Sequence, residues 1–110
     1  MIEASLQATI LEKLRDVTPL YRVLLFGSHA RDTAGPDSDL DLIVVVDSDD
    51  LPKGFTERAA YYLTISRALR DIQRKIPIDL LVYTKKEFEN FVTQRSGFSR
   101  QVLSEAVILS

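Results

Sequence analysis

The chain has 110 residues, enough for one compact domain. Apolar residues make up 45% and charged residues 27% of the sequence, which is typical of folded globular proteins and excludes a disordered chain. Cysteine is absent and His29 is the only histidine, so disulfides and thiolate zinc sites are excluded and a site of several histidines is not expected. The net charge of −2 argues against sequence-independent binding to nucleic acid. Any chemistry must therefore use carboxylates, hydroxyls, backbone amides and basic side chains.

The longest apolar run without a charge, Leu42 to Val46, is far shorter than the roughly 20 residues that a membrane-spanning helix needs. The first residues include an early acid, Glu3, and lack the basic segment that opens a secretory signal. We therefore expect a cytoplasmic protein that has one domain, residues 1–110, and does not enter a membrane.

Four elements are predicted in the first half of the chain. Apolar residues at helical spacing predict an amphipathic helix over residues 5–17. The apolar run 21–26 predicts a buried strand that stops at Gly27. Residues 28–34 predict a short helix. Residues 39–46 alternate acid with leucine and then become fully apolar, which predicts a strand with a polar start and a buried second half.

Residues 47–54 then form a predicted loop, and apolar spacing over residues 55–75 predicts one long helix. Residues 78–83 predict a third strand. A connection of about twenty helical residues between two strands indicates a right-handed parallel crossover. We therefore expect the second and third strands to be parallel neighbours.

The last part of the chain begins with Thr84 and Glu87, which have the spacing of a capping box at a helix start. A short helix over residues 99–105 and a small edge strand over residues 106–109 complete the prediction. The resulting fold class is α/β (α+β), with a small mixed sheet of three or four strands flanked by helices.

Three aspartates are expected at one end of this sheet. Asp39 and Asp41 open the second strand two residues apart, so their side chains point the same way. Asp79 sits second in the third strand and comes to the same end if the two strands are parallel. Three carboxylates in one place repel one another, and a hard divalent cation such as Mg²⁺ or Mn²⁺ is the natural counter-charge. A pair of such ions stabilises in-line displacement at phosphorus.

Gly27 and Ser28 reach that same end if the first strand runs antiparallel to the second. Glycine permits a close backbone approach, and the start of a helix favours phosphate. Together these residues predict a nucleoside triphosphate that is held by the turn and by metal ions and is attacked at phosphorus. Arg31 is either a further phosphate contact or an ion-pair partner of Asp37 or Asp39.

Several other residues that could take part in chemistry are expected to have structural roles instead. His29 is expected at the surface or as a helix cap rather than as a ligand. The acids of residues 47–50 are expected in a solvated loop. Tyr61 and Tyr62 lie on a predicted helical face and are expected to pack rather than to react.

Residues 27–32, Gly-Ser-His-Ala-Arg-Asp, and residues 38–41, Ser-Asp-Leu-Asp, match a known signature. They resemble the Gly-Ser-x-Ala-Arg-Gly…Ser-Asp-x-Asp pattern of the DNA polymerase beta-like nucleotidyltransferase superfamily, above all its minimal nucleotidyltransferase (MNT) branch. Members of that branch are antitoxins encoded beside HEPN-domain toxins. The resemblance covers most of the chain, since residues 77–81 are similar to the third-carboxylate strand and residues 102–109 to the closing tail. Asp32 departs from the pattern, which usually has glycine there.

The resemblance implies a nucleotidyltransferase fold in which Asp39 and Asp41 bind two Mg²⁺ ions. It further implies that Asp79 completes the metal site and helps to activate an acceptor hydroxyl. Gly27 and Ser28 would hold the β- and γ-phosphates of ATP. The implied reaction is transfer of AMP to a hydroxyl with release of pyrophosphate.

A domain this small has little material for a separate substrate-binding module, so we expect another protein to present the acceptor. In the resembling family the acceptor is a tyrosine of the HEPN ribonuclease toxin, which adenylylation silences. Two other functions compete with this one: a non-catalytic antitoxin that inhibits its partner by forming a complex, and nucleotidyl transfer to a small molecule such as an aminoglycoside. No direct contact with nucleic acid is expected.

Overall fold

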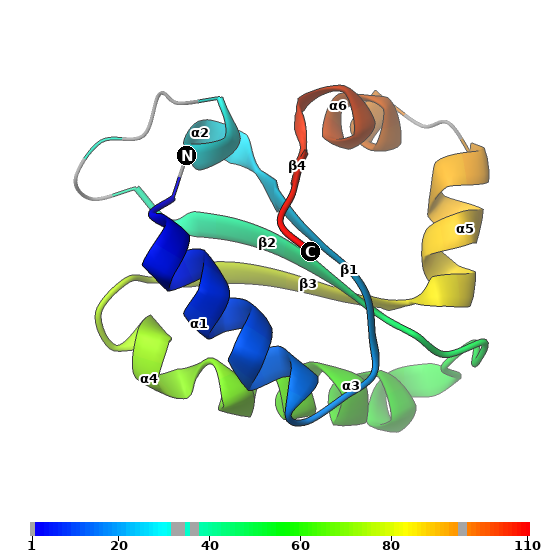
Figure 1. Cartoon of the computed structure of the whole chain (residues 1–110). Helices are drawn as coiled ribbons and strands as arrows, with labels where there is room; N and C mark the ends of the chain where they lie inside the picture. The colour runs from blue at the N-terminus through cyan, green and yellow to red at the C-terminus, as the bar shows by residue number, and fades with distance from the viewer. Residues whose placement is uncertain (1, 32–34, 36–37, 95–96) are drawn as a thin grey trace.

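The protein is described here by a computed structural model (Figure 1), which covers residues 2–31, 35, 38–94 and 97–110. Four strands form one sheet in the order β3-β2-β1-β4. Their bounds are Leu20–Phe26 for β1, Leu40–Val46 for β2, Ile78–Thr84 for β3 and Val107–Ile108 for β4. The mixed sheet with flanking helices confirms the predicted fold class.

The parallel pairing expected from the long connection between the second and third strands is confirmed. β2 pairs with β3 in parallel, and β1 pairs antiparallel with both β2 and β4. The register places Phe26, the last residue of β1, opposite Asp41, and Asp41 opposite Asp79. The end of β1 and the starts of β2 and β3 therefore meet at one end of the sheet.

Six helices surround the sheet in the described residues: α1 Ala4–Arg15, α2 Gly27–Ala30, α3 Gly54–Ala68, α4 Arg70–Gln73, α5 Lys85–Gln94 and α6 Gly97–Glu105. The prediction of one long helix over residues 55–75 is wrong, because the chain leaves the helical conformation at Leu69. The Leu69 amide is shared between the carbonyls of Ile65 and Ser66, both at 3.2 Å, as at many helix ends. Apolar spacing continues through this one-residue break because the Leu69 side chain stays fully buried.

The other boundaries differ from the prediction by one or two residues, apart from the second helix, and two of the differences lie near the aspartates. The second strand starts at Leu40 rather than at Asp39, since the Leu40 amide bonds to the Pro77 carbonyl at 2.9 Å and begins the pairing with β3. The helix expected over residues 28–34 is described as α2, Gly27–Ala30, and residues 32–34 lie outside the described part of the chain.

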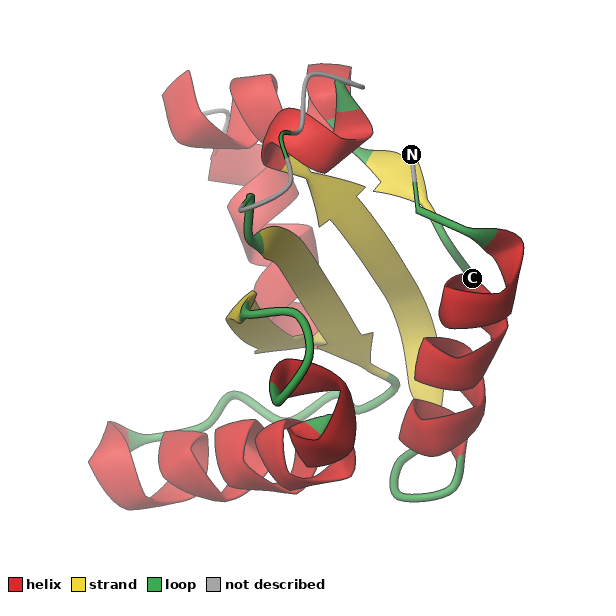
Figure 2. Ribbon diagram, turned by 90° about the vertical axis from the view of Figure 1, so that its left-hand side faces the viewer, coloured by secondary structure: helices red, strands yellow, loops and turns green. Residues whose placement is uncertain are grey.

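The sheet separates two apolar cores (Figures 1 and 2). Leu42 and Val44 of β2 face one core, which α1, α3 and α4 cover, whereas Ile43 and Val45 face the other, which α5 and α6 cover. All four side chains are fully buried, so the second half of β2 is enclosed on both faces as predicted. Because strand side chains alternate, Asp41 projects on the same side as Ile43, toward the face of α5 and α6.

The predicted capping box at the start of α5 is confirmed. The Thr84 amide donates to Glu87 Oε1 at 3.1 Å, and the Glu87 amide donates to Thr84 Oγ1 at 3.2 Å. The Thr84 hydroxyl also donates to the Asp50 carbonyl at 2.6 Å, which ties the loop after β2 to this helix. The side chain of Thr84 is almost completely buried as a result.

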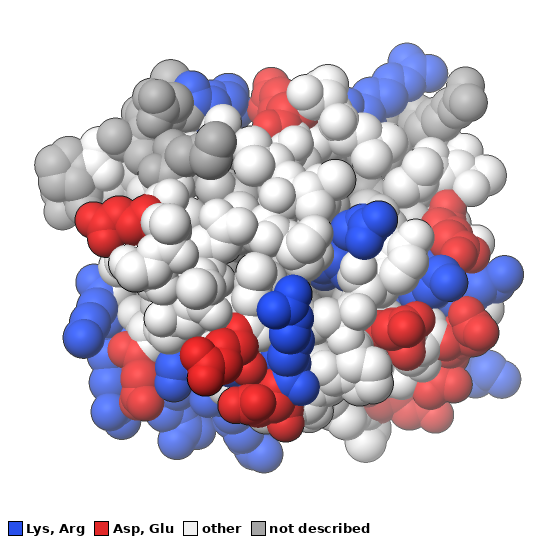
Figure 3. Space-filling model, in the orientation of Figure 1, with Lys and Arg blue, Asp and Glu red and all other residues white. Residues whose placement is uncertain are grey.

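Acidic and basic side chains lie side by side mainly in the lower part of the face shown in Figure 3, whereas the middle of that face is largely uncharged. Two of the surface ion pairs join Arg58 to Glu87 and Arg74 to Asp71. No helix in the described ranges combines the length and the apolar character needed to cross a lipid bilayer.

Candidate nucleotide site

The pairing of β2 with β3 brings two of the predicted aspartates together. Asp41 and Asp79 each sit second in their strand and face one another in register. Asp41 is half-buried and Asp79 is exposed. Asp39 is also exposed and immediately precedes β2, separated from Asp41 by the fully buried Leu40. The three carboxylates thus lie at one end of the sheet, as expected from the sequence.

Asp41 is electrostatically strained in this position. Burial raises the pKa of the Asp41 carboxyl, and repulsion from Asp79 and Asp39 raises it further. A side-chain hydrogen bond with Asp79 acts in the same direction, whereas the nearby His29 lowers the pKa. The ionised form of Asp41 therefore needs a counter-charge, which a bound cation would supply.

Gly27 lies directly against the Asp41 carboxylate. Its φ of +73° lies in the left-handed region that side chains rarely adopt. A Cβ atom built on Gly27 would lie 2.1 Å from Asp41 Oδ2 and 3.0 Å from Asp41 Cγ. The close approach expected of this glycine is therefore made to Asp41, because Phe26 pairs with Asp41 across the sheet. Ser28 follows in α2 and is half-buried.

His29 links α2 to the segment that precedes Asp39. Its Nε2 atom lies 3.1 Å from the Ser38 carbonyl oxygen. Because a carbonyl oxygen only accepts hydrogen bonds, Nε2 carries the hydrogen in this contact. The sequence did not predict this role, since nothing in the spacing of the two residues signals that Ser38 lies beside His29.

Arg31 has a partner that the sequence did not suggest. Its Nη1 donates to Glu105 Oε2 of α6 at 3.0 Å. The side chains are 46% and 34% exposed, so this is a surface ion pair of small energetic weight. Asp37, one of the partners considered for Arg31, lies outside the described residues, as does Asp32.

The donor atoms at this end of the sheet fit a hard divalent cation. In the described part of the chain, no three histidine or carboxylate side chains are grouped closely enough to enclose an ion by themselves. Asp41 and Asp79 nevertheless face each other, with Asp39 close enough to act on Asp41 electrostatically. Mg²⁺ is commonly bound by one or two carboxylates, with water and substrate phosphates completing its octahedron. The site therefore suits Mg²⁺ delivered together with a nucleotide.

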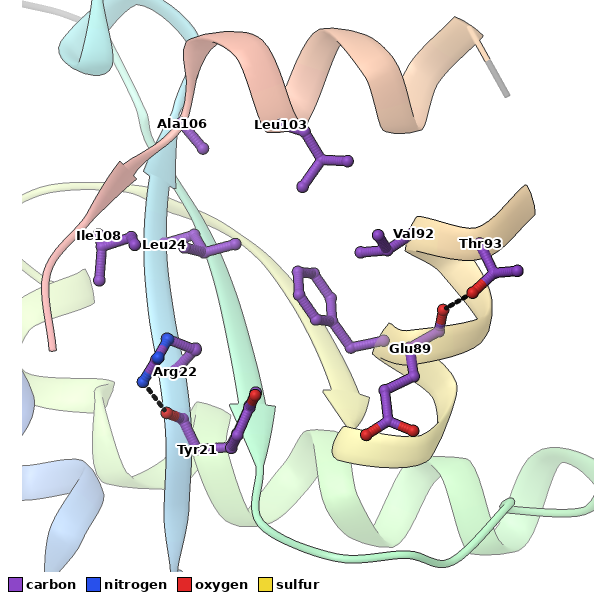
Figure 4. Close-up of a pocket in the computed structure, with 10 residues that line it drawn as sticks. Tyr21, Arg22, Leu24, Glu89, Val92, Thr93, Leu103, Ala106 and Ile108 are labelled. Carbon is purple, nitrogen blue, oxygen red and sulfur yellow. Dashed lines mark hydrogen bonds between the residues drawn. The ribbon is translucent and has the colours of Figure 1, made fainter. Parts of the chain in front are cut away.

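A separate cavity of about 450 Å³ lies between the β1–β4 edge and helices α5 and α6 (Figure 4). Leu24, Val92 and Leu103 give it an apolar wall, and Arg22 and Glu89 also border it. None of the three aspartates lines this cavity. It is thus distinct from the carboxylate end of the sheet.

The chain is thus an α/β protein whose mixed sheet sets paired carboxylates against a glycine turn. The sequence model of the nucleotidyltransferase domain family matches residues 8–109. The chain therefore belongs to the nucleotidyltransferase domain family. No curated protein matches it significantly.

Three solved structures share the fold, each covering 94% of this chain. A toxin–antitoxin structure with AMP-PNP has a TM-score of 0.61 and 20% identity, with 72% of its chain covered. A putative nucleotidyltransferase from Sulfolobus solfataricus has a TM-score of 0.59 and 18% identity, with 74% covered. A mutant of the toxin–antitoxin MntA-HpeT has a TM-score of 0.56 and 18% identity, with 71% covered.

Proposed function

We propose that this chain is a single minimal nucleotidyltransferase domain that transfers AMP from ATP to a hydroxyl of a partner protein in a Mg²⁺-dependent reaction. The observation that carries the proposal is the Asp41–Asp79 pair with Gly27 pressed against it. Family membership supports nucleotidyl transfer as the reaction. AMP-PNP, an analogue of ATP, is named with one of the similar structures and supports ATP as the donor.

In this proposal Asp39 and Asp41 hold the metal, with Asp79 completing the site. Bound magnesium ions neutralise the phosphates and make the α-phosphorus more electrophilic. Gly27 and Ser28 hold the β- and γ-phosphates, because glycine leaves the backbone amides of this turn open to the ligand.

The transfer step uses the exposed carboxylate of Asp79. The acceptor hydroxyl oxygen attacks the α-phosphorus and forms the new phosphorus–oxygen bond, while its proton passes to the Asp79 carboxylate. The bond from the α-phosphorus to the oxygen that bridges to the β-phosphate breaks, and pyrophosphate leaves with the electron pair. Because Asp79 is exposed, an acceptor on a large partner has access to it.

The proposed acceptor is a tyrosine of a HEPN-domain ribonuclease toxin, which would make this chain a cytoplasmic antitoxin. The resemblance of residues 27–32 and 38–41 to the MNT signature supports this partner. Two of the similar structures bear toxin–antitoxin names, which agrees with it.

The test measures the intact mass of whatever protein co-purifies with the tagged chain, before and after incubation with Mg²⁺ and ATP. We expect the partner to gain one adenylyl group with the wild-type chain and none with Asp39→Asn or Asp41→Asn. Asp47→Asn is the matched control, because Asp47 is an exposed aspartate just beyond the opposite end of β2, and it should leave transfer intact.

Each competing outcome has its own meaning. A stable complex that never gains mass, yet keeps the partner inactive, would replace the enzyme with a non-catalytic antitoxin. Transfer that persists in both Asp39→Asn and Asp41→Asn would contradict the metal assignment. Antibiotic resistance on expression of the chain alone would instead point to a small-molecule acceptor.

A further inference from the structure

We propose that His29 is a positioning residue that fixes Asp39 for metal binding, by donating a hydrogen bond from Nε2 to the Ser38 carbonyl. This inference rests on the proposed function, in which Asp39 is a metal ligand. It concerns a residue for which the sequence predicted only a place at the surface or a helix cap. The contact is 3.1 Å long and half-buried, so water competes with it only in part.

Asp39 is exposed, so its position depends on the residues at either side. On one side, Leu40 is fully buried and its amide bonds to the Pro77 carbonyl at 2.9 Å. On the other side, Ser38 is hydrogen-bonded to Gly35. The Ser38 amide donates to the Gly35 carbonyl at 3.2 Å, and the Gly35 amide donates to Ser38 Oγ at 2.9 Å.

These two bonds join Ser38 to Gly35 and do not attach Ser38 to the carboxylate site. The hydrogen bond from His29 does so, because His29 belongs to α2, which begins at Gly27 against the Asp41 carboxylate. The imidazole is also close enough to Asp41 to act on that carboxylate electrostatically. The short helix α2 therefore contacts Asp41 through its first residue, Gly27. Through its third residue, His29, it holds Ser38, the residue before Asp39.

This hydrogen bond matters because a metal ion binds more tightly to a ligand whose position is already fixed. Removing an outer residue that orients a ligand typically lowers metal affinity or activity about 10- to 100-fold. Among the described residues, the Leu40 amide bond holds one side of Asp39 and the His29–Ser38 bond holds the other. We therefore expect loss of the His29 donor to weaken metal binding without unfolding the protein.

The experiment compares His29→Phe, which keeps a ring but removes the donor, with His29→Gln, whose side-chain amide keeps a donor at a similar reach. Mn²⁺ binding to the purified chain in the presence of AMP-PNP is followed by the electron paramagnetic resonance signal of the free ion, and the binding of Mn²⁺ to AMP-PNP alone is subtracted. We expect His29→Phe to weaken Mn²⁺ binding about 10-fold. His29→Gln should restore most of the affinity. His29→Leu is a second variant that removes the donor should His29→Phe fail to fold.

Gln7→Met is the matched control, because the Gln7 side chain donates a hydrogen bond of the same kind to the Leu109 carbonyl at 2.8 Å, outside the carboxylate site. It should leave Mn²⁺ affinity unchanged. In the transfer assay with partner and ATP, His29→Phe should lower kcat more than it raises the KM for ATP. A purely structural role would not be rescued selectively by His29→Gln.

Equal Mn²⁺ affinity of His29→Phe and wild type would overturn the inference, as would a failure of His29→Gln to recover affinity. A wild-type chain that binds Mn²⁺ but transfers no AMP contradicts the proposed function instead, and the affinity series then supports the role of His29 by itself. A wild-type chain that binds no Mn²⁺ even with AMP-PNP present removes the metal assignment and this inference with it.

Discussion

Gly27→Ala tests whether the turn after β1 and the Asp41 carboxylate are built as one unit. The methyl group of the new alanine destabilises the folded protein in two ways. The first is the left-handed backbone conformation, φ +73°, which costs a residue with a Cβ about 1–2 kcal/mol. The second is the contact at 2.1 Å with Asp41 Oδ2, which forces the carboxylate to retreat by about 1 Å or more.

A displacement of this size should reduce transfer strongly while the protein stays folded. A misplacement of about 1 Å in a reacting constellation costs roughly 100-fold in rate. Gly54→Ala is the matched control, because Gly54 has φ +72° and nothing within 4 Å of a built Cβ. It should carry the same backbone cost and leave transfer unchanged.

Urea denaturation of both glycine variants, together with the partner-mass assay, measures the two effects separately. In an Asp41→Ala background, Gly27→Ala should cost only the backbone term, so the double-mutant cycle should show a coupling of about 0.5–3 kcal/mol. The reasoning is refuted if Gly27→Ala and Gly54→Ala transfer AMP equally well. It is also refuted if the cycle shows no coupling with Asp41.

Three further predictions concern stability. Because burial and neighbouring carboxylates raise the pKa of Asp41 above its ordinary 3.8, its ionised form destabilises the fold, so Asp41→Asn should raise the melting temperature near pH 7 in metal-free buffer. That gain should vanish below about pH 3, where the wild-type carboxyl is protonated in both states, and its persistence there would argue against the electrostatic cause. Thr84→Ala removes the cap of α5 and should lower the free energy of unfolding in urea by about 1–2 kcal/mol. Thr93→Ala, on the exposed surface of the same helix, should stay within about 0.5 kcal/mol, and equal losses would contradict the capping role. Glu105→Gln breaks the exposed pair with Arg31 and should cost less than about 1 kcal/mol, with a smaller loss at high salt; a larger, salt-independent loss would show that the pair is structural.

Much of the fold follows from short-range patterns in the sequence. The apolar runs placed the three main strands, and the length of the helical connection implied that β2 and β3 are parallel. Thr84 and Glu87 form their capping box because its two partners are only three residues apart. The parallel pairing also implied that Asp39, Asp41 and Asp79 come to the same end of the sheet, whereas the register that sets Asp41 opposite Asp79 came from the structure.

The break at Leu69 shows where such patterns stop. No glycine or proline marks it, and the apolar spacing continues across it, so the sequence predicts one helix where the structure has two. Packing decides this boundary, because the buried Leu69 side chain is held in the core while its backbone leaves the helical conformation.

The sequence by itself determined the three main strands, the parallel pairing of β2 with β3 and three aspartates at the starts of those strands, because periodicity and connection length are local properties of the chain. Only the tertiary structure decided that Gly27 abuts the Asp41 carboxylate, that His29 holds Ser38 and that Arg31 pairs with Glu105. These contacts depend on side-chain direction and on loops folding back across space. A contact between residues nine or seventy-four positions apart leaves no periodic trace, so it exists only once the sheet and its helices have packed.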